Sequence, residues 1–213
     1  MKKATLVATA MVGFTLLGLG QPVLATVIDG EGTADVEIKG TVGKLDNTNP
    51  EEIIPEGTDE WVNVTLDTAT AFHTTTASQH KMIDSADYQI ANNSGRGVQI
   101  TLSDIEGEPV LVDVLTINGM VNGNTPNPPI AVDLVTNSLP ANLTQEAWMV
   151  LGNKDGKLNI SSDTAGTYGK TASFNYSGST IANLPAGIKD EATEETYKLT
   201  LKFTSINEDG TIG

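Results

Sequence analysis

Apolar and polar side chains alternate along much of the chain with the two-residue period of a β-strand. Residues 61–66, 98–102 and 197–204 each place apolar side chains on one face and polar side chains on the other. This pattern predicts strands that are buried on one face only. Residues 110–117 form an almost continuous apolar run, which is typical of a strand in the middle of a sheet. A further strand is expected at residues 34–45.

Two short polar segments separate pairs of expected strands. The first has the sequence Asn-Asn-Ser-Gly-Arg-Gly and separates residues 88–90 from residues 98–100. The second, Lys154-Asp155-Gly156, separates residues 149–151 from residues 158–160. Asn and Gly tolerate the positive φ angles that tight hairpin turns require. Each pair of strands is therefore predicted to form a β-hairpin.

The remaining segments favour loops over helices. No segment sustains the three- and four-residue apolar spacing of an amphipathic helix, and only a short helical turn is expected, at residues 191–195. Residues 46–60 are rich in acidic residues and residues 122–129 contain three prolines, so both are predicted to be long loops. The sequence as a whole predicts an all-β fold, an antiparallel β-sandwich of roughly ten strands.

The N-terminus has the layout of a secretory signal peptide. Lys2 and Lys3 precede an uncharged run, and Val23-Leu24-Ala25 supplies the small residues that a signal peptidase recognises. We expect cleavage after Ala25 and export of the remaining chain. The expected parts are a signal peptide at 1–25, an N-terminal strand with an acidic, proline-containing loop at 26–60, and a β-sandwich domain at 61–213, with 26–213 as one domain in the alternative.

Composition narrows the function. The chain contains no cysteine, which excludes disulfides, cysteine-ligated zinc, a thiol nucleophile and a lipoprotein anchor. After residue 25 it carries 10 basic and 27 acidic residues, and this balance argues against binding to nucleic acid. No later stretch has the length of a membrane span, and the C-terminus shows no wall-sorting signal. We therefore expect a secreted protein, located at the cell surface without a covalent tether or membrane anchor.

Candidate catalytic and metal-binding residues are few. His73 and His80 flank a polar stretch, but their spacing matches no zinc signature. Ser78 and Asp84 would complete a Ser–His–Asp set with His73, yet no nucleophile elbow surrounds the serine. The acidic residues at 29–35 do not have the spacing of a calcium loop. We expect two surface histidines and no catalytic residue, metal or cofactor.

The two tryptophans are the scarce residues that suit a binding role. Trp61 follows a polar loop, and alternation places it opposite the apolar face of residues 62–66. Packing in the core is the commoner fate of a tryptophan, whereas an exposed indole there would stack on a sugar ring. Trp148 lies in a second apolar segment and presents the same two alternatives.

The chain closes on the strand Glu195-Thr196-Tyr197-Lys198-Leu199-Thr200-Leu201-Lys202-Phe203-Thr204. Through this strand, the signal peptide and the all-β pattern, the chain resembles the WxL-type surface proteins of low-GC Gram-positive bacteria. Both Trp-x-Leu motifs are degenerate here, because the chain has Trp148-Met149-Val150 and Phe203-Thr204-Ser205 at the two sites. The resemblance implies non-covalent attachment to peptidoglycan or to other surface proteins. The expected ligand-binding residues are Trp61, Trp148, Tyr197 and Phe203.

Three hypotheses for function follow. The leading one is a non-enzymatic surface protein that attaches non-covalently to the cell wall or to a wall-associated protein complex. The alternative is a structural subunit that self-associates by β-strand addition, in which residues 34–45 pair with the open sheet edge of a neighbour. A secreted hydrolase is the third and least favoured class.

Overall fold

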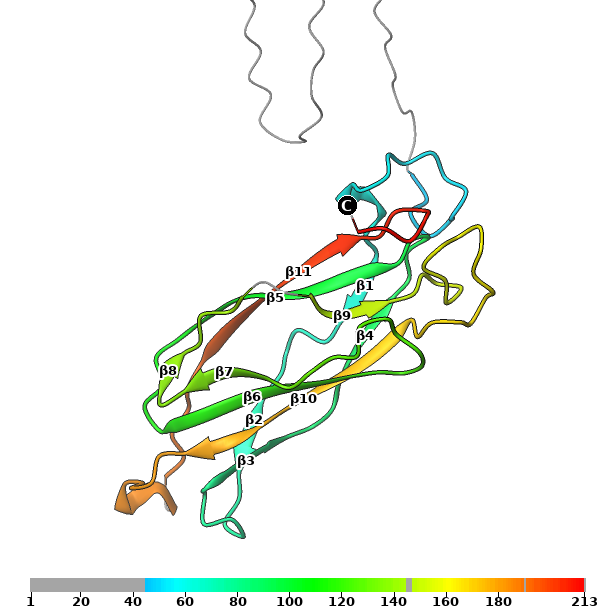
Figure 1. Ribbon diagram of the computed structural model, residues 1–213. Helices are drawn as coiled ribbons and strands as arrows, with labels where there is room; N and C mark the ends of the chain where they lie inside the picture. The colour runs from blue at the N-terminus through cyan, green and yellow to red at the C-terminus, as the bar shows by residue number, and fades with distance from the viewer. Residues whose placement is uncertain (1–44, 145–146, 190, 213) are drawn as a thin grey trace, which may run out of the picture. The chain divides into compact units, whose positions relative to one another are not determined.

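The computed structural model describes residues 45–144, 147–189 and 191–212 (Figure 1). Within these residues, eleven strands form two antiparallel sheets, accompanied by two short 3-10 helices and no α-helix. The predicted all-β antiparallel fold is confirmed. No helix in these ranges is long and apolar enough to cross a membrane. The expected signal peptide and residues 34–44 of the expected N-terminal strand lie outside the described residues.

The larger sheet has eight strands. Its main row, in spatial order, is β1 (Val64–Leu66), β4 (Tyr88–Asn92), β10 (Thr171–Thr180), β6 (Val112–Val121), β7 (Val132–Thr136) and β8 (Leu139–Pro140). The other two strands, β2 (Phe72–Thr74) and β3 (Met82–Ser85), continue this sheet beyond the end of β4, because β10 pairs first with β4 and then with β3. β1 and β2 therefore follow one another along the same edge of the sheet.

The smaller sheet has three strands, in the order β11 (Tyr197–Ser205), β5 (Val98–Gly107) and β9 (Ala147–Leu151). β5 pairs with β11 along its whole length and with β9 near its start. Figure 1 shows β11 and β5 side by side in this sheet, and β6 and β10 side by side in the other. The apolar faces of the two sheets form one core, with fully buried residues on β4, β5, β6, β7 and β9.

The first predicted hairpin is wrong, because β4 and β5 belong to different sheets. The polar segment between them carries the chain from one sheet to the other. Asn92 is buried there, and its side-chain amide donates hydrogen bonds to the carbonyl oxygens of Arg96 and Gly152, each at 2.9 Å. These residues serve to satisfy buried backbone groups where the chain crosses between the sheets.

The second predicted hairpin has its turn but lacks its second strand. Asn153 is buried, and its side-chain oxygen accepts hydrogen bonds from the backbone N–H groups of Asp155 and Lys157, both at 2.9 Å. Residues 158–160 then leave β9, and Asn159 forms an isolated bridge with Asp209. The turn chemistry was recognised correctly, but the pairing partner lies far along the chain.

The two predicted loops and the predicted central strand are present in the structure, whereas the predicted helical turn is not. Residues 46–60 contain no strand and only the start of a 3-10 helix, η1 (Asp59–Trp61). Residues 122–129 contain neither strand nor helix, so both predicted loops are confirmed. The apolar run at 110–117 contains the first six residues of β6, and β6 is paired on both sides as a central strand is. The helical turn expected at 191–195 is wrong, because the 3-10 helix η2 lies at Ala186–Lys189, where Ile188 N–H bonds to the Pro185 carbonyl.

Arg96 fastens the loop at 46–60 to the end of the sandwich. Its side chain is only 3% exposed, and its Nη2 lies 2.6 Å from a carboxylate oxygen of Glu56. Its Nη1 donates to the Pro50 carbonyl at 2.6 Å, and the guanidinium carbon lies 4.0 Å from the ring centroid of Trp61. The loop therefore packs on the sandwich through a hydrogen-bonded, stacked cation, together with the buried side chain of Ile54.

We expect Arg96→Met to lower the free energy of unfolding by about 2–3 kcal/mol, because the buried guanidinium is the shared partner of the loop and Trp61. Urea unfolding of both proteins measures this difference. Glu106→Gln is the control: it removes the exposed Lys198–Glu106 ion pair and should change stability by less than about 0.5 kcal/mol. Equal stability of Arg96→Met and the wild type would contradict the role assigned to Arg96.

Candidate functional site

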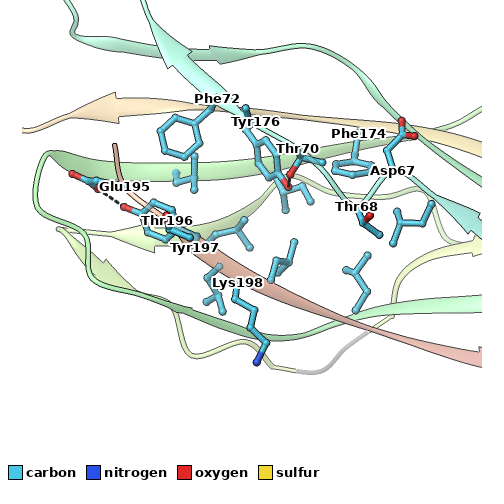
Figure 2. Close-up of a pocket in the computed structure, with 18 of the residues that line it drawn as sticks. Asp67, Thr68, Thr70, Phe72, Phe174, Tyr176, Glu195, Thr196, Tyr197 and Lys198 are labelled. Atoms are coloured by element: carbon cyan, nitrogen blue, oxygen red, sulfur yellow. Dashed lines mark hydrogen bonds between the residues drawn. The ribbon is translucent and has the colours of Figure 1, made fainter. Parts of the chain in front are cut away.

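The two sheets differ in width, and a groove opens between them beside β11. The main row of the larger sheet is six strands across, whereas the smaller sheet has three. The groove encloses about 700 Å³. One wall is formed by residues 66–72, which connect β1 to β2 along the edge of the larger sheet, and by the inner faces of β6, β7 and β10. The other wall is formed by β11 and the residues that precede it. Figure 2 shows these side chains converging from both sheets.

The wall formed by β11 is a row of apolar side chains at alternate positions. Tyr197, Leu199, Leu201 and Phe203 all line the groove and remain only half-buried. They are only half-buried because β11 is the last strand of its sheet, and no further strand among the described residues lies beside it. An uncovered apolar row of this kind favours the binding of a further apolar surface.

The opposite wall is aromatic. Phe72 lies 6.0 Å from Tyr197 between ring centroids and closes one end of the groove. Phe174 and Tyr176 from β10 pack edge-to-face with centroids 6.0 Å apart, and both point toward the groove (Figure 2). The Tyr176 hydroxyl lies 3.2 Å from the Thr70 hydroxyl, and burial raises the pKa of this tyrosine.

The backbone of β11 offers a free edge directly at the groove. β11 pairs with β5 alone, and no described residue forms a hydrogen bond with the outward backbone groups of residues 197–204. In an antiparallel pair, alternate N–H and C=O groups of an edge strand point away from the sheet. Such a row is a template for pairing with another strand.

The start of β11 is fixed by Glu195. Its carboxylate accepts hydrogen bonds from the Tyr197 hydroxyl and from the Leu111 N–H, both at 2.5 Å, and from the Val110 N–H at 3.3 Å. Burial raises the pKa of Tyr197 well above its usual value, and the hydrogen bond and negative charge of Glu195 raise it further. The neutral tyrosine therefore ties β11 to the connection between β5 and β6.

Three of the four sequence-predicted binding residues meet at the groove. Trp148, Tyr197 and Phe203 all line it, whereas Trp61 lies under Arg96 at the end of the sandwich. Neither indole is exposed: Trp61 is 0% and Trp148 2% accessible, so of the two alternatives left open by the sequence, the structure shows core packing for both. Trp61 belongs to η1 and not to a strand, so alternation did not describe its direction.

Trp148 is held inside the groove wall. Its indole Nε1–H donates to the Ile130 carbonyl at 3.1 Å, and its ring packs edge-on against Phe174. This hydrogen bond satisfies the polar atom of the indole, which lets the ring serve as core.

Sequence reasoning missed the wall opposite β11. The alternation of Ala172, Phe174 and Tyr176 would have identified the buried face of β10. Phe72 gave no such signal, because it stands alone in a polar segment and reaches the groove only through the pairing of β2 with β3.

The histidines do not assemble a site. His80 Nδ1 lies 2.9 Å from the Thr74 hydroxyl, and His73 is exposed on β2 opposite Asp84. The Ser78 hydroxyl donates to the Thr75 carbonyl at 2.9 Å. Across the ranges that the structure covers, no group of three His, Asp or Glu side chains is placed to hold a metal ion.

Comparison with known proteins finds no family model, curated protein or solved structure that matches this chain. The groove and the edge of β11 are therefore interpreted from their own geometry.

The raised pKa of Tyr197 predicts a loss of stability at alkaline pH. The protonated Tyr197 hydroxyl contributes its full stabilisation below about pH 10, the ordinary pKa of tyrosine. As the pH rises above that value toward the folded-state pKa, this contribution to the free energy of unfolding is lost. The free energy of unfolding should fall between pH 9.5 and about 11. In Tyr197→Phe the fall should be shallower, as urea unfolding across this range would measure; identical slopes would contradict the assignment.

Proposed function

We propose that this protein is a secreted, non-enzymatic surface protein, held non-covalently in a wall-associated protein assembly, and that its groove binds an extended polypeptide segment of a partner. The observation that carries the proposal is the free edge of β11 lying directly beside an apolar groove. A strand added at this edge would pair its backbone with β11. Its alternate side chains would enter the groove.

The geometry supports a polypeptide better than a glycan. Sugar rings are bound by exposed aromatic faces, but both indoles are buried here. The groove offers instead a row of half-buried apolar side chains beside a strand edge. Both features match the regular repeat of a β-strand, in which every second side chain points to the same face.

Charge supports the same conclusion. The chain has a formal charge of −15, and a wall rich in anionic polymer repels such a protein over a Debye length of about 8 Å at physiological salt. Main-chain pairing and apolar burial act at contact and do not require opposite net charges. The resemblance to WxL-type proteins supports a location at the wall, and a protein partner removes the need for direct attraction to its polymer.

A sedimentation experiment tests the proposal. Gram-positive cell walls are prepared in two forms, one retaining surface proteins and one stripped of them by detergent and protease. We expect the purified protein to sediment with the first form and to bind the stripped form at least tenfold less. Because salt screens the repulsion between like charges, binding should persist or strengthen as salt rises. Equal binding to the stripped walls would contradict a protein partner.

A substitution in the groove locates the binding site. Leu201→Asp places a charge among the apolar residues of β11 and should weaken wall binding at least tenfold, because a desolvated carboxylate has no partner there. Thr136→Asp makes the same change of charge at an exposed position on β7 and should bind as the wild type does. Circular dichroism checks that both variants fold. Undiminished binding by a folded Leu201→Asp protein would exclude the groove.

A further inference from the structure

We infer that the segment received by the groove is residues 34–42 of a second copy of this chain, so that copies join by strand addition to β11. This inference rests on the proposed function of the groove and names its occupant. It is argued from the pattern of the segment, from charge, and from where the chain enters the sandwich.

The segment has the pattern that the groove requires. Ala34, Val36, Ile38, Gly40 and Val42 alternate with polar residues, so a strand formed by them has one face that is free of charge. β11 also spans nine residues, with its apolar side chains at alternate positions. At a rise of about 3.3 Å per residue, both would extend about 26 Å. The segment is therefore long enough to cover the uncovered edge of β11.

The polar faces are complementary in charge. Beside its apolar row, β11 exposes Lys198 and Lys202 on its other face. The polar face of the segment carries two acids, Asp35 and Glu37, and one base, Lys39, so its net charge is opposite to that of the two lysines of β11. Opposite charges on adjacent strands stabilise pairing, and here they would meet on the solvent-facing side.

The position of residue 45 indicates a second copy as the source. The Asn47 carbonyl accepts a hydrogen bond from the Gly95 N–H at 2.6 Å, and the Thr58 carbonyl accepts one from the Ser205 hydroxyl at 3.1 Å. The loop that follows residue 45 is thus fixed at the end of the sandwich where β11 finishes. To lie beside β11 of its own copy, the preceding segment would have to run parallel to it.

A segment from a second copy is free of this restriction. Every strand pair in the two sheets is antiparallel, and antiparallel pairing is the more stable per residue. The segment of another copy can enter from the Tyr197 end and run antiparallel to β11. The segment that is given and the groove that receives it are different surfaces of the protein. The contact is therefore head-to-tail and leads to linear assemblies of copies.

Self-association is tested by light scattering during size-exclusion chromatography of the secreted form of the protein. We expect a ladder of oligomers that grows with concentration and is reduced at least tenfold in Ile38→Asp, which puts a charge on the apolar face of the segment. Thr33→Asp carries the same change of charge just outside the segment and should leave the ladder intact. A wild-type protein that stays monomeric at all concentrations would overturn the inference.

Disulfide trapping distinguishes a second copy from the chain's own segment, because the natural chain contains no cysteine. One copy carries Ile38→Cys and a differently tagged copy carries a cysteine at one of the groove positions 199, 201 or 203. We expect a mixed disulfide between the two tags for at least one of these pairs. When both cysteines are placed in one chain, a fast-migrating monomer as the sole product would show closure within the chain and overturn the inference.

The same protein preparations separate failure of this inference from failure of the proposed function. If no oligomer or mixed disulfide forms while wall binding still depends on Leu201, the second copy is excluded and the groove keeps a different polypeptide partner. If wall binding is also insensitive to Leu201→Asp, both proposals are overturned. A ladder abolished by both Ile38→Asp and Leu201→Asp supports both.

Discussion

A sheet with six strands across its main row, faced by one of only three, leaves apolar surface that the smaller sheet cannot cover. This mismatch in width is the constraint from which the candidate site follows. It leaves β11 at an edge, keeps its alternate apolar side chains half-buried, and opens a groove of about 700 Å³ above β6 and β10. Burial of apolar area is the main force that holds a sandwich together, so a side left uncovered is both a cost in stability and a source of affinity.

The two ends of β11 are held by different chemistry. At its start, the Glu195 carboxylate joins the Tyr197 hydroxyl to two backbone N–H groups. Just beyond its end, Glu56 accepts hydrogen bonds from buried Arg96 and from the Glu208 N–H. Each end is held by a glutamate carboxylate, although the chain as a whole is strongly acidic. A cation or several hydrogen-bond donors are needed to keep such a negative charge close to the core. An edge strand fixed in this way keeps its uncovered middle in the extended form that pairing requires.

The local pattern of apolar and polar residues was enough to predict individual strands. The alternation at residues 98–102 and 197–204 identified β5 and β11, and the apolar run at 110–117 identified central β6. The segment before Val98 carried hairpin chemistry, but the same Asn and Gly residues serve a crossing between sheets, and nothing local separates the two cases. Alternation did not describe the direction of the Trp61 side chain, because this residue lies in a 3-10 turn that directs it inward. The groove itself arises from a difference in strand number between two sheets, which no single segment encodes.

The fastening of the 46–60 loop by Arg96 has a mechanical consequence for a linear assembly of copies. A pull along such an assembly would enter each sandwich near Asn47, at the Arg96 end, and leave it through the segment seated beside β11. The force would then act along the strands, so all hydrogen bonds of the added strand would be loaded together in shear and none would be peeled first. Within each copy, the hydrogen bond between the Gly95 N–H and the Asn47 carbonyl would carry the load first. The guanidinium of Arg96 would carry it next, because it holds the loop at Pro50 and Glu56.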